Sequence, residues 1–461
     1  MTTLRFGWPL PRRLRSAFLA RGARVFWLAA AGGLPAVLAA TAAPPAKTEL
    51  QDKVTQYGIT WTFERPCPVG RFATGDWFVI GPARVAAVSP APTAERHGSV
   101  VNPPAGDKQG YDRRMSGFDA SLRASFPLLL QPGQSLVSVD SVEKLGEKTP
   151  DTVEGHYCRG PLRTAAVLTC LAAPPPADAF RPGFCGVWKE MFAISQLKLD
   201  RLPELAPPVK PPASEKYARF LERVWLDHQR EWVNREMHPL ENMPDYGREI
   251  THIVSDTALL LLLEGAARER STLLHRCVQK GIDYYAIVQS NDHLWIANGG
   301  HNSGRKWPIL FAGLLLNHPG MMNVKATFQE DQQTYYARQF HGRPVADKVA
   351  VWRITVGNPN KNHEEVAPDT WAAYGKGDNN GTKAEGYRKL NGPTWVGQAL
   401  AARLTGMCEH WNHPPFFDYV DRWWRETQSA KPFVKAMWEK YRALADEIGG
   451  AARQKRETPG K

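Results

Sequence analysis

A proline-rich segment divides the chain into two parts that differ in hydrophobic periodicity. Five of the ten residues from 203 to 212 are proline, which lacks a backbone N–H and interrupts both helices and strands. Before it, residues 59–199 contain short β-type runs separated by glycine and proline. After Ser214 the apolar residues recur at the helical period. The sequence therefore predicts a β-rich part followed by a mainly helical part.

We expect an α+β multidomain protein. Residues 48–202 are predicted to form a β-sandwich-like domain, and residues 203–213 a semi-rigid linker. Residues 214–449 are predicted to form a mainly helical domain, an (α/α) toroid or incomplete barrel of stacked antiparallel hairpins. The expected strands are 60–63, 77–80, 84–88 and 135–142, and the expected helices are 250–267, 271–290, 308–316, 327–340, 394–405 and 416 into the 440s. Residues 450–461 are expected to be a disordered basic tail.

The first 42 residues have the order of a secretory signal. They carry six arginines and no acidic residue, followed by an apolar run over 25–40 and the small residues Ala40-Thr41-Ala42. The apolar run is too short to favour a stable membrane span, so removal of this segment predicts a secreted or periplasmic protein. The alternative is an uncleaved amphipathic or membrane anchor.

The charge of the chain favours an acidic partner other than nucleic acid. The formal net charge is +12, and loss of the six arginines in the signal segment leaves +6. No repeated basic–aromatic pattern or nucleic-acid motif accompanies this charge, so we expect no nucleic-acid partner. A modest positive field suits an acidic polysaccharide.

The six cysteines and their neighbours raise two further questions. An exported protein can form disulfides, and Cys158, Cys170 and Cys185 are close enough in sequence for a local bridge. Cys408, His410 and His413 have the chemistry of metal ligands, but no matching fourth ligand accompanies them. We therefore expect no resident metal, with calcium as an alternative aid in neutralising a uronate carboxylate.

The densest group of polar side chains lies in residues 298–306, Asn-Gly-Gly-His-Asn-Ser-Gly-Arg-Lys. The glycines predict a turn that brings His301, Asn302, Arg305 and Lys306 to the start of an apolar helix. Cleavage of a uronate polymer by β-elimination requires groups that neutralise the substrate carboxylate, a base and an acid. His301 and Asn302 fit these requirements, while Arg305 and Lys306 are suited to hold carboxylates of the polymer.

Two tyrosines complete the set. Tyr246 and Tyr387 each have an arginine within two positions, Arg248 and Arg388, and a phenol needs a nearby cation to act as a base. His252 and Asp256 are four residues apart on one predicted helix. They are therefore either a catalytic pair or an ordinary hydrogen-bonded pair.

Sixteen tryptophans offer candidate platforms for sugar rings. Those near predicted loops or helix ends are expected to bind substrate: Trp295, Trp307, Trp371 and Trp395. Those at helical spacing are expected to pack in the core: Trp225, Trp232, Trp423 and Trp424.

Residues 242–248, 298–308, 386–388 and 395–404 together resemble polysaccharide lyases of the helical-toroid type, the alginate lyase and heparinase-like group. The resemblance covers the latter half of the chain. It implies a cleft in an incomplete (α/α) barrel, His301 and Asn302 as neutraliser or base, and Tyr246 or Tyr387 as proton donor. It thus predicts an exported lyase acting on an acidic polysaccharide.

Two other functions are compatible with the sequence. An inverting glycoside hydrolase on a similar barrel would need two carboxyl groups across the scissile bond, and Asp245, Glu249 and Glu385 are candidates. A non-catalytic glycan-binding protein of the cell envelope would need neither the carboxyl pair nor the tyrosines.

Overall fold

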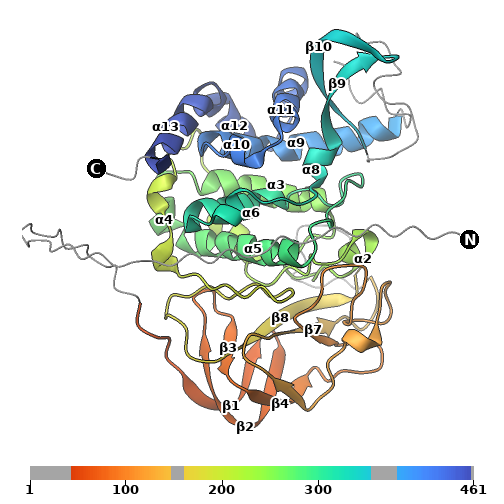
Figure 1. Ribbon diagram of the computed structural model, residues 1–461, viewed down its shortest axis with the longest axis vertical. Helices are drawn as coiled ribbons and strands as arrows, with labels where there is room; N and C mark the ends of the chain where they lie inside the picture. Colours follow the sequence, from red (N-terminus) through yellow and green to blue (C-terminus); the bar gives the residue numbers. More distant parts are fainter. Residues whose placement is uncertain (1–42, 147–159, 355–381, 458–461) are drawn as a thin grey trace, which may run out of the picture. The chain divides into compact units, whose positions relative to one another are not determined.

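The computed structural model describes residues 43–146, 160–354 and 382–457 (Figure 1). The expected signal segment 1–42, Cys158 and Trp371 lie outside these ranges. Residues 43–461 form one unit, so the β-rich and helical parts are not separate bodies joined by a linker. None of the described helices combines the length and apolarity needed to cross a bilayer.

The β-rich part is a single sheet curled into half a barrel, so the expected β-sandwich is wrong. Seven strands follow the order β5-β7-β8-β3-β2-β4-β6, with β1 paired to β2. The pairs are antiparallel except for β3 and β8. The strand bounds are β1 Glu49–Gln56, β2 Ile59–Arg71, β3 Trp77–Ile80, β4 Ala83–Ser89, β5 Ser99–Val101, β6 Leu128–Leu130, β7 Ser135–Ser141 and β8 Leu162–Leu171.

Strand β8 shows how one sheet contributes to two hydrophobic cores. Side chains alternate between the faces of a strand. On β8, Ala165 and Val167 therefore join the core shared with the helices, while Ala166 and Leu168 join the core inside the curl. A strand buried on both faces reads as a continuous apolar run, which is how β8 appears in the sequence.

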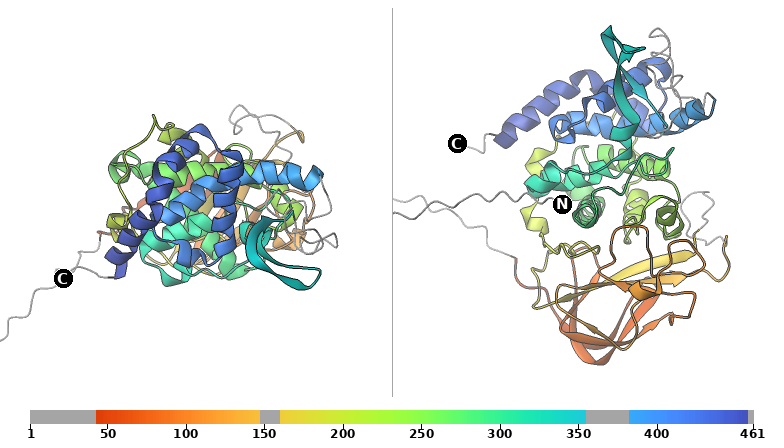
Figure 2. Two further views of the ribbon diagram at one scale, coloured as in Figure 1. Left: turned by 90° about the horizontal axis from the view of Figure 1, so that it is seen from above. Right: turned by 45° about the vertical axis from the view of Figure 1, so that its right-hand side comes forward.

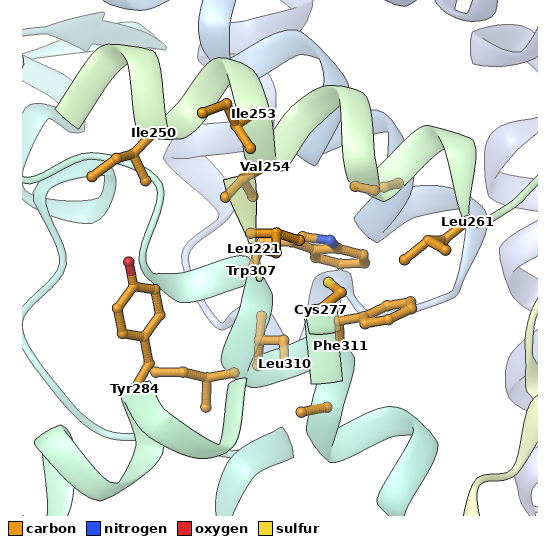
Figure 3. Close-up of a cluster of buried hydrophobic side chains, with 14 of the residues drawn as sticks. Leu221, Ile250, Ile253, Val254, Leu261, Cys277, Tyr284, Trp307, Leu310 and Phe311 are labelled. Atoms are coloured by element: carbon orange, nitrogen blue, oxygen red, sulfur yellow. The ribbon is translucent and has the colours of Figure 1, made fainter. Parts of the chain in front are cut away.

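The helical part begins where the proline-rich segment ends. Its helices are α1 Ser214–Phe220, α2 Glu231–Glu236, α3 Gly247–Leu260, α4 Ala266–Glu269, α5 Ser271–Ser290, α6 Lys306–Leu316, α7 Pro319–Met322, α8 Gln329–Gln333, α9 Thr382–Leu404, α10 Cys408–Trp411, α11 Pro414–Thr427, α12 Pro432–Tyr441 and α13 Ala445–Glu457. In Figure 1, α3, α5 and α6 lie between the sheet and the layer that contains α9, α11 and α12. Figure 3 shows the apolar side chains that α3, α5 and α6 bury together, with Trp307 among them.

The expected helix 327–340 is wrong beyond Gln333. The chain turns from α8 into β9 (Thr334–Phe340), which pairs with β10 (Arg343–Trp352) as an antiparallel hairpin. The two residues between the strands, His341 and Gly342, have φ of 45° and 74°, the positive values that a tight hairpin turn requires.

The ends of the expected segments also need correction. Residues 450–457 are not a disordered tail, because α13 continues to Glu457. The proline-rich segment is not a free linker, because Leu205 bonds through its N–H to the Leu262 carbonyl and through its own carbonyl to the Glu264 N–H. Helix α9 begins at Thr382, twelve residues before the expected start, and α3 ends at Leu260.

A buried ion-pair triad joins the sheet to the helices. The Arg181 guanidinium donates to Asp76, beside β3, at 2.9 Å and to Asp283 of α5 at 2.7 Å. All three side chains are buried. Because breaking one arm would leave a buried charge without its partner, the triad fixes α5 against the sheet.

The contact between α5 and α6 gives a test of this packing. A Cβ added at Gly281 would lie 2.2 Å from the Pro308 carbonyl oxygen and 2.4 Å from the Ala312 Cβ. We expect Gly281→Ala to lower the free energy of unfolding by ~1–3 kcal/mol, measured by urea denaturation, because the helices must separate. Gly450→Ala in α13, where no atom lies within 4 Å, should instead raise it by ~0.5–1 kcal/mol. Equal effects of the two substitutions would contradict this description of the core.

Candidate functional site

Arg305 is a structural residue of the 298–306 segment. Its guanidinium donates to both carboxylate oxygens of Asp227, at 2.6 and 3.0 Å, and to the backbone carbonyls of His301 and Ser303. Both side chains of the ion pair are fully buried. The expectation that Arg305 holds a substrate carboxylate is therefore wrong, since this arginine is occupied inside the protein.

The environment keeps Asp227 ionised. Burial acts to raise the pKa of Asp227, but the charge of Arg305 and hydrogen bonds from His238 and Arg305 outweigh it and hold that pKa far below its usual range. The Tyr284 hydroxyl also donates to this carboxylate, at 2.9 Å. The pair therefore links the segments that precede α2 and α6 to α5.

The backbone carbonyl of Gly299 also fixes the 298–306 segment. It accepts hydrogen bonds from the side-chain amides of Gln329 at 3.0 Å, Gln333 at 2.6 Å and Asn391 at 3.0 Å. The side-chain carbonyl oxygen of Gln329 in turn accepts a hydrogen bond from the backbone N–H of Asn302 at 2.9 Å. Three donors on one carbonyl hold the glycine turn in a single position.

Three further expected ligand-binding residues are also turned inward. The Asn302 side chain donates to the Ile296 carbonyl at 2.7 Å and is buried. The Lys306 ammonium contacts Asp331 and the Trp411 carbonyl, and it too is buried. Arg388 is fully buried between Glu385 and Glu426. Each of these side chains is therefore buried and bound to other parts of the protein rather than exposed at a surface.

The tryptophan expectations are confirmed for Trp225 and Trp423, which are buried in the core, and are wrong for four others. Trp295, Trp307 and Trp395 are at most 1 % exposed and belong to the core, so they are not platforms for sugar rings. Trp395 is fixed by a hydrogen bond to the Ser303 hydroxyl at 2.8 Å. Trp232, expected to be a core residue, is 49 % exposed.

Five side chains around the glycine turn form what we call the tyrosine cluster: Trp232, Arg235, Tyr246, His301 and Tyr387. The His301 ring lies 5.5 Å from the Trp232 ring and 5.8 Å from the Tyr246 ring, centroid to centroid. The Arg235 guanidinium lies 5.0 Å from the ring centres of both Trp232 and Tyr246. Both tyrosines are half-buried.

Backbone and side chains of the cluster approach closely at Gly299. A Cβ added there would lie 2.7 Å from the Tyr387 ring, and the residue has a φ of 57°. Asn391 donates to both the Gly299 and the Tyr387 carbonyls. Only glycine fits this turn against Tyr387 without strain.

The two tyrosines interact directly. Burial raises the pKa of Tyr246 to about 12, and the charge and hydrogen bond of Tyr387 act in the same direction. Arg235 and Arg248 oppose the rise through their positive charges. The two hydroxyls therefore interact, and their contact favours the protonated form of Tyr246.

Arg248 and His252 lie along α3, beyond Tyr246. The Arg248 guanidinium is 5.5 Å from the Tyr246 ring centre and forms an ion pair with Glu249, with 30 % of its side chain exposed. His252 is half-buried in the next turn, and its catalytic role stays a prediction. Asp256 does not depend on His252, since it binds Tyr217 at 2.8 Å and Lys431 at 3.3 Å.

The expected metal and disulfide features can be examined only in part. Within the ranges that the structure describes, no group of three or more His, Cys, Asp or Glu side chains has the arrangement of a metal site. The expected local bridge is not formed between Cys170 and Cys185, which donate instead to the carbonyls of Leu130 and Pro103. Pairing with Cys158 lies outside the described residues.

Three residues beside the glycine turn were not expected to contribute to a site: Trp232, Arg235 and Asn391. Trp232 and Arg235 lie three residues apart and therefore share one face of α2, a signal that the sequence offered. Asn391 lies in a polar stretch of α9, and no local pattern connects it with Gly299. No family model, curated protein or solved structure matches this chain.

The Asp227–Arg305 pair predicts a large loss of stability on substitution. Asp227→Ala leaves a buried guanidinium without its carboxylate, and we expect the free energy of unfolding to fall by ~3–5 kcal/mol. Because the pKa of Asp227 is lower in the folded than in the unfolded chain, its contribution is present at neutral pH and lost as the pH falls below about 4. Urea denaturation at pH 7 measures the effect. Glu64→Ala, which breaks the exposed pair with Arg84, should change stability by less than ~1 kcal/mol.

The tyrosine pair predicts a titration change. Tyr387→Phe removes the hydroxyl that interacts with Tyr246, so the pKa of Tyr246 should fall from about 12 toward the ordinary value. NMR titration of tyrosine labelled at Cζ resolves this shift, with Tyr246→Phe identifying the resonance. An unchanged pKa would show that the two hydroxyls are not coupled.

Proposed function

We propose that this chain is an exported polysaccharide lyase that cleaves an acidic, uronate-containing polymer by β-elimination at the tyrosine cluster. The observation that carries the proposal is that two half-buried tyrosines, Tyr246 and Tyr387, interact beside the glycine turn. A Cβ added at Gly300 would lie 3.3 Å from the Tyr246 ring, and one added at Gly299 would lie 2.7 Å from the Tyr387 ring. Arg235 and Arg248 lie over the Tyr246 ring. Such a pair supplies a proton donor and a proton acceptor at one place.

The chemistry of elimination assigns a role to each group. The C–H next to the uronate carboxylate must lose a proton, and the leaving oxygen on the adjacent carbon must gain one. The raised pKa of Tyr246 keeps its phenol protonated, which suits the proton donor. Tyr387, whose hydroxyl interacts with that of Tyr246, is then the base, and Arg248 is the cation available to the carboxylate.

Other members of the cluster bind and orient. Trp232 presents an exposed ring, and sugar rings have apolar faces that stack on such surfaces. Arg235 is held by Asp245 at 3.2 Å and lies under both Trp232 and Tyr246, so it fixes their relative positions. His301 lies between the same two rings and is buried. We therefore assign His301 a positioning role rather than contact with the carboxylate.

The hydrolase alternative is less well supported by the carboxyl groups. Inverting hydrolysis needs one protonated and one ionised carboxyl group across the bond. Asp245, Glu249 and Glu385 each form an ion pair with an arginine, so each of these carboxyl groups is already bound by the protein. A hydrolase would need two of them to face a substrate instead.

The proposal also covers the type of helical fold and the export of the protein. The helical region would correspond to the (α/α) toroid of the lyases that the sequence resembles, and residues 1–42 to the signal that exports the protein to the periplasm or medium. The mixed α+β architecture is consistent with such a lyase.

The test is the ultraviolet absorbance of the unsaturated uronate, which elimination produces and hydrolysis does not. The purified chain would be incubated with alginate, glucuronan, pectic and glycosaminoglycan polymers. We expect product with one polymer, and a rate lower by about 100-fold or more in Tyr246→Phe and in Tyr387→Phe. Both substitutions remove one hydroxyl and leave the ring in place.

Tyr441→Phe is the matched control, because it also removes one hydroxyl, one that binds the Ala206 carbonyl outside the cluster. Full activity of both cluster variants would overturn the assigned roles. New reducing ends without unsaturated product would instead indicate hydrolysis. Binding of a polymer with neither product would indicate a glycan-binding protein.

A further inference from the structure

A polar cavity lies at the β9–β10 hairpin, outside the tyrosine cluster. It has a volume of about 520 Å³ and is formed by β9, β10 and α11, which stand side by side in Figures 1 and 2. We call it the hairpin groove and define it by Tyr336, Lys348, Asp418, Asp421, Arg425 and Glu426. Its lining is rich in charge of both signs.

The three carboxylates of the groove are already bound by the protein. Asp418 accepts a hydrogen bond from the Tyr336 hydroxyl. Asp421 accepts from Arg403 at 2.8 Å and from Arg442 at 2.6 Å. Two cations compensate the negative charge of Asp421, whereas Asp418 is held by a neutral hydroxyl and keeps its charge.

Glu426 is compensated in the same way. It pairs with Arg422 at 3.4 Å and with Arg388 at 3.5 Å. Burial raises the pKa of Glu426 above its ordinary value despite these cations. Two of the three acidic side chains of the groove, Asp421 and Glu426, are therefore paired with cations of the protein.

Two cations of the groove are in the opposite situation. Lys348 and Arg425 are exposed, and neither forms an ion pair with a carboxylate among the described residues. The Lys348 ammonium lies 4.3 Å from the centre of the Tyr336 ring, which holds the charge in place by a cation–π contact. Tyr336 is itself fixed by its bond to Asp418.

We infer that the hairpin groove binds a carboxylate-bearing stretch of the polymer, with Lys348 and Arg425 as its anion-binding residues. This inference rests on the proposed function for the identity of the ligand. A cavity of this size accommodates a sugar residue. Exposed cations that form no ion pair with the described carboxylates suit the carboxylates that repeat along a polyuronate chain.

The test is the affinity of the chain for oligomers of polygalacturonate and of alginate, measured by calorimetry at low salt. A Tyr387→Phe background prevents their degradation. Lys348→Ala/Arg425→Ala should weaken binding about tenfold, because two charge-assisted contacts of about threefold each are lost. Lys53→Ala/Arg65→Ala removes the same net charge from exposed positions of the sheet and should leave binding unchanged.

Three outcomes would overturn the inference: equal affinity of the groove variant and its parent, equal loss in both double variants, or no binding of either oligomer by the parent. The outcome for the lyase is separate, because release of unsaturated product is measured in the chain that retains Tyr387. If only the groove variant loses binding and the chain that retains Tyr387 releases no unsaturated product, the groove inference would stand and the lyase proposal would be rejected.

Discussion

The buried ion pair between Arg305 and Asp227 is the interaction on which the surrounding structure depends. A fully buried charge pair is tolerated only when hydrogen bonds satisfy both partners. Arg305 meets this condition with the Asp227 carboxylate and two backbone carbonyls, and Asp227 meets it with Arg305, Tyr284 and His238. The pair thereby fixes the start of α6 against α5 and the segment before α2. Arg305 also binds the His301 and Ser303 carbonyls, so the pair holds the C-terminal side of the glycine turn.

The glycine turn connects this buried ion pair to the tyrosine cluster. Its Gly299 carbonyl is held by three side-chain amides, and one of them, from Asn391, also binds the Tyr387 carbonyl. The position of Tyr387 relative to Tyr246 is therefore set by buried hydrogen bonds rather than by surface contacts. This separation of tasks, with ion pairs inside and half-exposed phenols outside, is typical of a site whose geometry must be maintained while a ligand exchanges.

Local patterns predicted much of the secondary structure and little of the site. Strand β3 and helix α5 have the expected bounds, because their periodicity is uniform over their whole length. The β9–β10 hairpin was missed because residues 329–333 favour a helix and the His341-Gly342 turn is a weaker signal than Asn-Gly. At the site, Arg248 lies over the Tyr246 ring as expected, whereas Arg388 pairs with Glu385 and Glu426 instead of with Tyr387. Arg305 was assigned to the ligand instead of to Asp227.

The sequence by itself determined the division into a β-rich and a helical part, and the glycine turn near which the tyrosines gather. Both depend on short-range properties, the period of apolar residues and the conformational freedom of glycine. Only the tertiary structure decided which polar side chains face inward. Arg305 was distinguished from Arg248, and Trp307 from Trp232, by partners far away in the sequence. Charge and aromaticity are visible in a sequence, whereas burial depends on what packs against each side chain.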